Sequence, residues 1–357
     1  MNSKSFELGV IEGFYGAPWS WDIRKEYAEF LKRVGYSFYY YAPKSDPFFR
    51  RKWREAFPQE LYEQLAILID AYHAAGVEFG VGFSPYEIYL AFDDDAKKHL
   101  QARIEVFNRL GVDRLAILFD DMKCAPGLAR TQAGILHWVR DRSHAKQLIM
   151  CPTYYSLDPI LDKIFGERPA DYLEVLGSEL DTSIGVIWTG EEVCSKQYTE
   201  KHLSEINEKL HRKVWLWDNY PVNDGPKMCK FLHVDSFRNR PAILSDLLQA
   251  HAVNPMNQAL LSQIPMLTLK ESYRDRSAYN PETAFLRAAT TLVNPKFAAE
   301  IQKDLHLFTQ KGFEQLSETE KQNLILSYSR YKHPVADEIV SWLEGKTIVT
   351  REVFLTQ

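Results

Sequence analysis

The amino-acid sequence predicts an α/β fold, a (β/α)8 TIM barrel followed by a small C-terminal helical domain. Short apolar runs alternate with amphipathic stretches of helical length, and the alternation continues for eight units. Polar and aromatic residues cluster just after the apolar runs, and the alternation stops near residue 272. Alternating strands and helices with short connections indicate a parallel sheet, and eight such units close a barrel. We therefore assign residues 1–272 to the barrel and residues 273–357 to an α-helical domain.

The first half of the barrel is predicted from three strand and helix pairs and a fourth strand. We expect strands at residues 8–11, 36–41, 77–83 and 115–119, and helices at residues 22–34, 58–75 and 94–110. Gly35, Gly76 and Gly111 directly follow these helices. Glycine just past the last helical residue is a common helix stop, which supports the predicted boundaries.

The second half repeats the pattern, and a purely helical region follows it. Strands are expected at residues 147–151, 184–188, 214–217 and 250–253, and helices at residues 131–142, 170–176, 199–210 and from 258 onward. Further helices are expected at residues 283–293, 297–308, 317–331 and 335–343. Their apolar faces could pack on the barrel or on a second subunit, so a homo-oligomer formed through the C-terminal helices is one expectation.

The overall charge argues against polyanionic partners. Lys and Arg number 43 against 48 Asp and Glu, which gives a net charge of −5. This mildly acidic balance does not favour nucleic acid or an anionic membrane. No apolar run approaches the ~18 residues of a membrane span, and the start shows no secretory signal. We therefore expect a cytoplasmic protein.

Cysteine spacing and glycine motifs give no sign of a metal or cofactor. Cys124, Cys151, Cys194 and Cys229 are widely spaced and form no metal-ligand pattern, so we expect free thiols. No phosphate-cradling glycine motif is present, and we expect neither metal nor cofactor. Aromatic residues are abundant, with 19 Tyr, 20 Phe and 8 Trp. Rings at a pocket mouth can stack on sugar faces, which makes carbohydrate a candidate substrate.

The fourth predicted strand ends in two adjacent carboxylates, Asp120 and Asp121. One interpretation is structural, because Asp at a strand end often makes a turn or caps the next helix. The other is catalytic, because active sites of such barrels lie at the carboxyl ends of the strands. Other polar and aromatic residues follow the predicted strands, and these are Gly13, Tyr15, Lys44, Tyr155, Trp217, Asn219, Asp224 and Asn254.

Adjacent carboxylates are poorly placed for a conventional retaining glycosidase. That mechanism needs an acid and a separate nucleophile about 5 Å apart across the sugar. Neighbouring residues instead suit the exception in which the 2-acetamido oxygen of the substrate is the nucleophile. One carboxylate would then hold the acetamido N–H, and the other would protonate the leaving oxygen.

Several motifs resemble those of glycoside hydrolase family 84, which contains O-GlcNAcases and β-N-acetylglucosaminidases. They arrive in the family's order over about the first 260 residues and are Val10 to Trp19, Tyr41-Ala42-Pro43-Lys44, Trp53-Arg54-Glu55, Leu118 to Asp121, Cys151-Pro152-Thr153 with Tyr155, Trp188-Thr189-Gly190, Trp217-Asp218-Asn219 and Asn254-Pro255. The resemblance implies removal of β-linked GlcNAc from Ser or Thr of proteins, or from related glycoconjugates.

The resemblance also implies a role for each candidate residue. Asp120 would polarise the acetamido group, and Asp121 would be the general acid and base. The remaining residues would bind the sugar: Tyr155 and Asn219 at the acetamido group and the oxazoline intermediate, Trp217 as its wall, the Gly13 carbonyl, Lys44, Asp224 and Asn254 at ring hydroxyls, and Tyr15 along the sugar site.

Two departures from the family pattern bear on the leaving group. Ser84-Pro85-Tyr86-Glu87 stands where the family usually reads Ser-Pro-Gly, and Ser45 follows Lys44 where an acid is common. Both changes lie near the rim and concern the leaving-group preference more than the chemistry. Separately, two alternatives remain open: a hexosaminidase that acts on oligosaccharides or hyaluronan-like fragments, and a non-catalytic GlcNAc-binding protein on the same fold.

Overall fold

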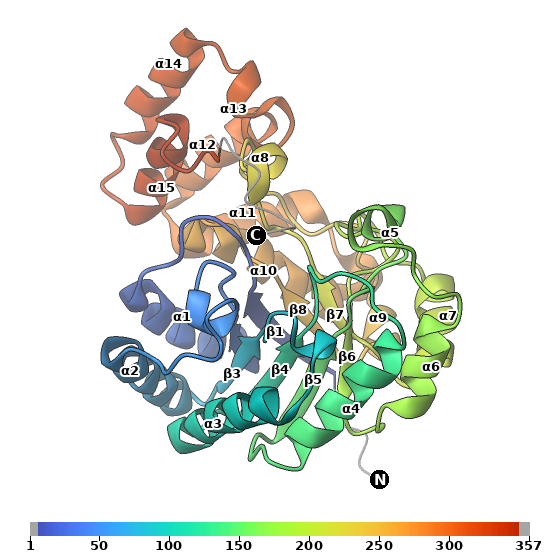
Figure 1. Ribbon diagram of the computed structural model, residues 1–357. Helices are drawn as coiled ribbons and strands as arrows, with labels where there is room; N and C mark the ends of the chain where they lie inside the picture. The colour runs from blue at the N-terminus through green and yellow to red at the C-terminus, as the bar shows by residue number, and fades with distance from the viewer. Residues whose placement is uncertain (1–5, 350–357) are drawn as a thin grey trace.

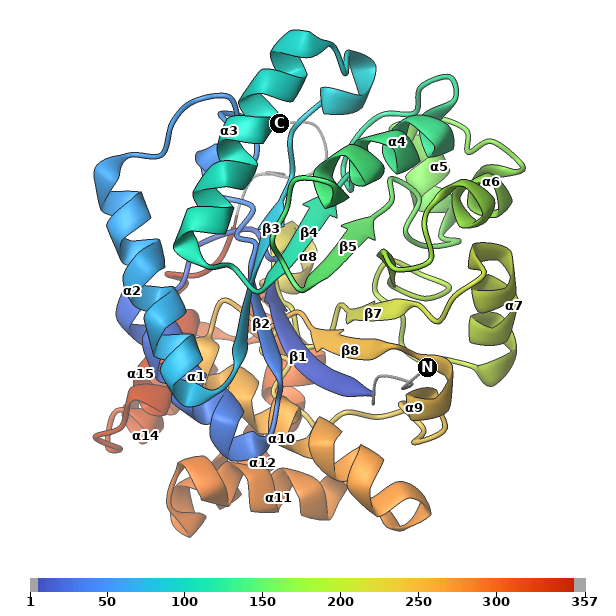
Figure 2. The same cartoon turned by 90° about the horizontal axis from the view of Figure 1, so that it is seen from below.

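Eight parallel strands form a closed barrel in the computed structural model, which describes residues 6–349. Each strand pairs with the next, and β8 pairs back with β1, which confirms the predicted (β/α)8 TIM barrel (Figures 1 and 2). The strands are β1 Glu7–Glu12, β2 Phe38–Tyr41, β3 Glu78–Phe83, β4 Arg114–Leu118, β5 Gln147–Cys151, β6 Gly185–Trp188, β7 Trp215–Asp218 and β8 Ala250–Val253.

Helices surround the strands, as Figure 2 shows. They are α1 Trp21–Val34, α2 Gln59–Ala75, α3 Asp94–Leu110, α4 Leu128–Arg140, α5 Pro159–Phe165, α6 Tyr172–Glu179, α7 Glu200–Leu210, α9 Leu244–Leu247 and α10 Ala259–Asp275. The short helix α8 Gly225–Met228 lies instead beside the C-terminal helices, as Figure 1 shows. The helices α5, α8 and α9 were not predicted. They have 7, 4 and 4 residues, which is too short for a 3.6-residue periodicity to show in sequence.

Two predicted boundaries were wrong for identifiable reasons. Tyr36 was predicted to begin the second strand, but its N–H donates to Leu31 O (2.9 Å) and completes the end of α1 after Gly35. The strand therefore begins at Phe38. The helix expected from Thr131 begins three residues earlier, at Leu128, directly after Gly127 in a left-handed conformation.

An ion-pair cluster around the buried Arg114 lies at the amino-terminal end of the barrel, and its two glutamates are partly exposed. Arg114, the first residue of β4, donates to Glu7 at 2.6 Å and to Glu78 at 2.5 Å. Its guanidinium also lies 4.6 Å from the centre of the Phe38 ring. Because Glu7 and Glu78 are likewise the first residues of their strands, this cluster closes the end opposite the polar pocket described below.

The C-terminal helices have a hydrophobic core of their own. They are α11 Pro281–Leu292, α12 Pro295–His306, α13 Gly312–Gln315, α14 Glu318–Tyr328 and α15 Pro334–Leu343, with a π-helical turn at Leu307–Lys311. This core also includes Leu261 and Ile264 of α10 and Leu232 from the segment between α8 and α9. Helix α10 therefore packs against both the barrel and the helical region, which lies to one side of the barrel in Figure 1.

Glu338 of α15 joins the helical region to the barrel. Its carboxylate accepts hydrogen bonds from the N–H groups of Leu260 (3.0 Å) and Leu261 (2.8 Å) at the start of α10. Burial raises the pKa of Glu338 to about 7. Among residues 6–349, no helix is both long and apolar enough to cross a membrane.

Candidate active site

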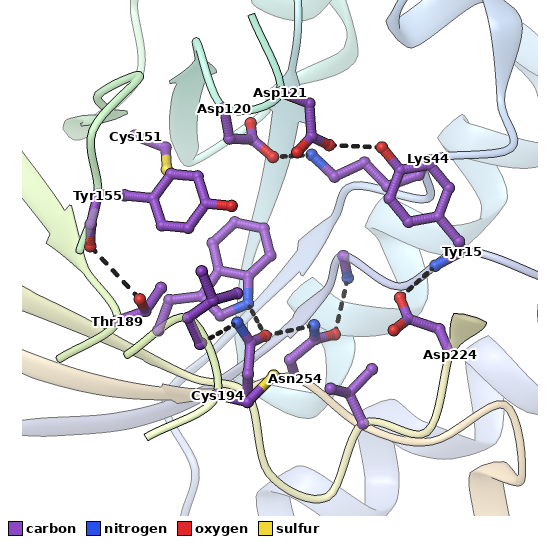
Figure 3. Close-up of a pocket in the computed structure, with 15 residues that line it drawn as sticks. Tyr15, Lys44, Asp120, Asp121, Cys151, Tyr155, Thr189, Cys194, Asp224 and Asn254 are labelled. Atoms are coloured by element: carbon purple, nitrogen blue, oxygen red, sulfur yellow. Dashed lines mark hydrogen bonds and ion pairs between the residues drawn. The ribbon is translucent and has the colours of Figure 1, made fainter. Parts of the chain in front are cut away.

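One pocket at the carboxyl ends of the strands brings together all ten residues that the sequence singled out (Figure 3). Five further residues line it, and the sequence did not predict them as site residues: Cys151, Thr189, Val193, Cys194 and Val222. Cys151 and Thr189 lie in two of the motifs quoted above. Val193, Cys194 and Val222 carry no chemical pattern in the sequence that would have identified them.

Asp120 forms an ion pair with Lys44 through its Oδ2 atom. The two side chains are only 9% and 4% exposed, so little water screens the pair. The other carboxylate oxygen, Oδ1, is buried and has no hydrogen-bond partner among residues 6–349. Asp120 therefore offers one buried acceptor that a ligand donor could use.

Asp121 is held by different partners from another side. Its backbone has a φ of 59°, in the left-handed region that Asp tolerates better than most residues. The Tyr15 hydroxyl donates to Asp121 Oδ2 at 2.5 Å, and Arg50 Nη2 lies 4.0 Å from the same oxygen. In Figure 3 the Asp120 carboxylate meets Lys44, while that of Asp121 meets Tyr15. Two consecutive carboxylates thus have separate environments.

Phe119, which precedes the pair, is anchored through both of its main-chain groups. Its N–H donates to Cys151 O at 2.9 Å, and its carbonyl accepts from the Thr153 hydroxyl at 3.0 Å. Gln132 of α4 donates to the same hydroxyl at 2.9 Å. These contacts fix the point at which the chain leaves β4 and thereby position both carboxylates.

Tyr15 and Asp224 form the wall of the pocket that adjoins Asp121. The Tyr15 N–H donates to Asp224 Oδ2 at 2.8 Å. Burial, together with the charge of Asp121, raises the pKa of Tyr15 well above its ordinary value, so its hydroxyl stays protonated. Burial also raises the pKa of Asp224 to about 6, although the Tyr15 N–H and Lys44 act in the opposite direction. Asp224 is therefore partly protonated just below neutral pH.

A chain of amide hydrogen bonds forms the floor of the pocket. Asn219 Oδ1 accepts from Trp217 Nε1 and from Asn254 Nδ2, both at 2.9 Å. Asn254 Oδ1 accepts from the Gly13 N–H at 3.3 Å, and Asn219 Nδ2 donates to Val193 O at 2.8 Å. A primary amide has two N–H bonds, so Asn219 keeps one that is not used in this contact.

Tyr155 supplies a hydroxyl donor between the carboxylates and the amide floor. Its side chain is buried, and its hydroxyl points into the pocket in Figure 3. Burial, and then the charges of Asp121 and Asp120, raise the pKa of Tyr155 well above its ordinary value. Its carbonyl accepts from the Thr189 N–H at 2.9 Å, which fixes the backbone at this point.

The C-terminal helices support the segment that carries Asp224. Helix α8 follows Asp224 directly, and the residues after it pair with the helical region. The Phe313 N–H donates to Lys230 O at 2.7 Å, and the Leu232 N–H donates to Phe308 O at 3.1 Å. Asn223, next to Asp224, donates its side-chain N–H to Phe231 O at 3.0 Å. The helical region is therefore connected to the pocket through main-chain contacts.

The part of the chain that the structure describes contains no cluster of potential metal ligands. Over residues 6–349, no group of three or more His, Cys, Asp or Glu side chains is arranged to hold a metal ion. All four cysteines are free. The functional groups that line the pocket are carboxylates, amides, tyrosine and threonine hydroxyls, two thiols, an indole and one lysine.

Comparison with models of protein families identifies the family of this chain. A model of the β-N-acetylglucosaminidase (NAGidase) family matches residues 8–310, which is most of the chain. The chain belongs to the β-N-acetylglucosaminidase family. Its membership of this family of glycoside hydrolases confirms the resemblance to glycoside hydrolase family 84 that the motifs indicated.

Relatives of this β-N-acetylglucosaminidase family member include curated proteins and solved structures. Protein O-GlcNAcase of Rattus norvegicus and of Mus musculus are each 29% identical over 283 residues. The aligned region covers 76% of this chain and 30% of each relative. A mutant of the Thermobaculum terrenum O-GlcNAc hydrolase matches with a TM-score of 0.79 at 29% identity, over 94% of this chain and 80% of that chain. CpGH84B matches with a TM-score of 0.73 at 26% identity, and the match covers 96% of this chain and 59% of that chain.

The packing of Gly13 against Trp217 gives a test of the pocket geometry. A Cβ atom added at Gly13 would lie 2.2 Å from the Trp217 ring, so the ring must move in Gly13→Ala. We expect a loss of about 1–3 kcal/mol in the free energy of unfolding, as for an overpacked core. Urea unfolding measures the loss, and a crystal structure shows the ring.

Gly134→Ala is the matched control, because a Cβ there has no atom within 4 Å. Gly134 lies in α4, and we expect it to gain about 0.5–1 kcal/mol from the better helix propensity of Ala. An unmoved Trp217 in Gly13→Ala, with stability within about 0.5 kcal/mol of the parent, would contradict the described packing.

Proposed function

We propose that this chain removes terminal β-linked GlcNAc with retention of configuration, by substrate-assisted catalysis through an oxazoline intermediate. The observation that carries the proposal is the buried Asp120 Oδ1 atom, which has no protein hydrogen-bond partner among residues 6–349. An amide N–H is the donor that a 2-acetamido sugar would bring to it. The chain spans about 30% of the length of its curated relatives. That it shares their activity is part of this proposal.

Asp120 would act on the acetamido group without moving a proton to the leaving group. Its Oδ2 atom is already paired with Lys44, which holds the carboxylate in place. The free Oδ1 atom would accept the acetamido N–H and thereby increase the electron density on the acetamido oxygen. That oxygen then attacks C1 of the sugar while the bond from C1 to the leaving oxygen breaks.

Asp121 would transfer the proton in both steps. In the first step its carboxylic acid gives a proton to the leaving oxygen as the oxazoline forms. In the second step the resulting carboxylate takes a proton from water, and the water oxygen attacks C1. The bond between C1 and the acetamido oxygen breaks, which opens the oxazoline ring and restores the acetamido group. Two displacements at C1 leave its configuration unchanged. The short contact from Tyr15 to Asp121 Oδ2 supports this role because it leaves Oδ1 for the reaction.

The other pocket residues would bind the sugar. Tyr155 and Asn219 each have a donor near the proposed acetamido site, and Trp217 would wall it. The Gly13 carbonyl, Lys44, Asp224 and Asn254 would bind ring hydroxyls, and Tyr15 would line the sugar. The raised pKa of Asp224 allows it to donate as well as accept a hydrogen bond to a hydroxyl.

The proposed substrate is GlcNAc on Ser or Thr of a protein or on a related glycoconjugate. The names of the relatives, O-GlcNAcase and O-GlcNAc hydrolase, support this choice. The alternative is a hexosaminidase that prefers glycans. Faster turnover of glycopeptides than of oligosaccharides would favour the proposed substrate, and the reverse would favour the hexosaminidase. A cytoplasmic location and assembly through the C-terminal helices stay predictions.

The activity itself is tested with an aryl N-acetyl-β-glucosaminide that releases a chromophore. We expect release with a bell-shaped dependence on pH, because one acid and one ionised carboxylate are both required. The matched aryl β-glucoside lacks the acetamido group and should be a far poorer substrate. No release at any pH between about 4 and 8 would favour the non-catalytic GlcNAc-binding protein.

The division of labour between the two carboxylates predicts unequal variants. Asp121→Asn should slow substrates with poor leaving groups on the order of 10²-fold or more, and should affect activated aryl leaving groups much less. Asp120→Asn should slow both kinds of substrate, because the acetamido attack is needed for each. Steady-state kinetics over a series of leaving groups measures this, and equal losses in both variants would count against the assignment.

A further inference from the structure

Arg50 has an unusual environment for a buried arginine. Arg24, Arg103, Arg114 and Arg240 are also buried, and each donates hydrogen bonds to a carboxylate or a main-chain carbonyl. Arg50 Nη1 and Arg103 Nε are both buried without a hydrogen-bond partner within residues 6–349. Arg103 still donates through Nη2 to two main-chain carbonyls, whereas Arg50 meets Asp121 as an ion pair at 4.0 Å. An unsatisfied buried guanidinium nitrogen is costly, so a structural role alone accounts poorly for it.

The guanidinium of Arg50 lies beside Asp121. Arg50 follows the 3-10 turn Pro47–Phe49, and its Nη2 atom is 4.0 Å from Asp121 Oδ2. This distance is too long for a hydrogen bond but gives strong attraction between opposite charges. Both side chains are 8% exposed, so bulk water screens the interaction little. The same oxygen accepts the Tyr15 hydroxyl, which leaves Asp121 between two donor groups.

Tyr86 covers the other side of the guanidinium. Its ring centre lies 5.4 Å from Arg50 Cζ and 4.6 Å from Arg51 Cζ. Trp53 Nε1 donates to Tyr86 O at 3.2 Å and holds the segment in place. Tyr86 belongs to the segment that departs from the family pattern. It is not among the residues that line the pocket, but it contacts Arg50, which pairs with Asp121 of the pocket.

Arg50 remains charged in this environment. Burial opposes the charged form, but Tyr15, Asp121 and Asp120 together raise the pKa of Arg50 above its ordinary value. A permanent positive charge thus faces the carboxylate that is assigned the proton transfer. Its attraction is strongest when that carboxylate is ionised, which is the state formed as the leaving oxygen takes the proton.

We propose that Arg50 is a positioning residue for Asp121, which it holds against Tyr15 and whose negative charge it stabilises as the proton leaves. The inference rests on the proposed function, because it assumes that Asp121 is the general acid. It goes beyond that function because Arg50 touches neither the sugar nor the leaving group in this role. Its positive charge would lower the energy of the state in which the leaving oxygen has taken the proton and Asp121 carries a negative charge.

The test is the pH dependence of kcat/KM in Arg50→Gln. A positive charge favours ionised Asp121, so its removal should move the basic limb of the profile to higher pH by about one unit. Proton donation to poor leaving groups should become roughly tenfold slower, while activated aryl substrates should change little. Other groups around Asp121 are the same in both proteins and cannot cause the shift: Tyr15, Lys44, Asp120, Cys151, Tyr155 and Asp224.

Two further variants make the outcome decisive. Arg50→Lys keeps the charge and should retain the basic limb of the parent, even where Arg50→Gln fails to fold. Arg51→Gln removes a neighbouring charge that also contacts Tyr86 but is exposed, and it should leave the profile unchanged. If the parent is active, two results would overturn the role of Arg50. One is a basic limb that does not move in Arg50→Gln, and the other is a basic limb that shifts by about a full unit in Arg50→Lys. An inactive parent would instead contradict the proposed function.

Discussion

The left-handed backbone of Asp121, with a φ of 59°, is the constraint on which the site depends. Two buried carboxylates on consecutive residues repel each other unless each has its own compensating partner. The backbone conformation allows this, since Asp120 pairs with Lys44 while Asp121 accepts from Tyr15 and faces Arg50. The cost of an unfavourable φ is tolerated because it separates the two carboxylates chemically. Their proposed difference in role follows from this difference in partners.

The barrel makes this constraint possible by fixing where each loop begins. Parallel strands that close into a barrel deliver all their carboxyl ends to one face, so residues at or after the ends of β1, β2, β4, β5, β6, β7 and β8 meet in one pocket. Anchors behind the pocket hold the loops: Phe119 is fixed by Cys151 and Thr153, and the segment after Asp224 is fixed by the C-terminal helices. The helical region is thus part of the support for one wall of the site.

The sequence was sufficient to predict the barrel and the ten residues that lie in the pocket. The strands were recognisable as apolar runs, and each of the ten residues lies at or just after the end of one of them. Residues after a strand are identifiable without knowing their contacts, as for Lys44 and Asn254. Arg50 was missed because it lies in the basic run Arg50-Arg51-Lys52, where nothing local separates a buried guanidinium from exposed neighbours. One of its contacts, Tyr86, lies in a different loop, and such a contact cannot be read from the local sequence. The short helices α5, α8 and α9 were missed because periodicity needs longer segments.

The most direct test of the central claim, that the substrate supplies its own nucleophile, uses aryl glucosaminides with one, two or three fluorines on the acetamido methyl. Fluorine withdraws electrons from the acetamido oxygen and weakens its attack on C1, while the leaving group and the protein stay the same. If Asp120 assists that attack, kcat should fall steeply with each fluorine. A flat response would remove the acetamido group from the chemistry and contradict the roles assigned to both carboxylates.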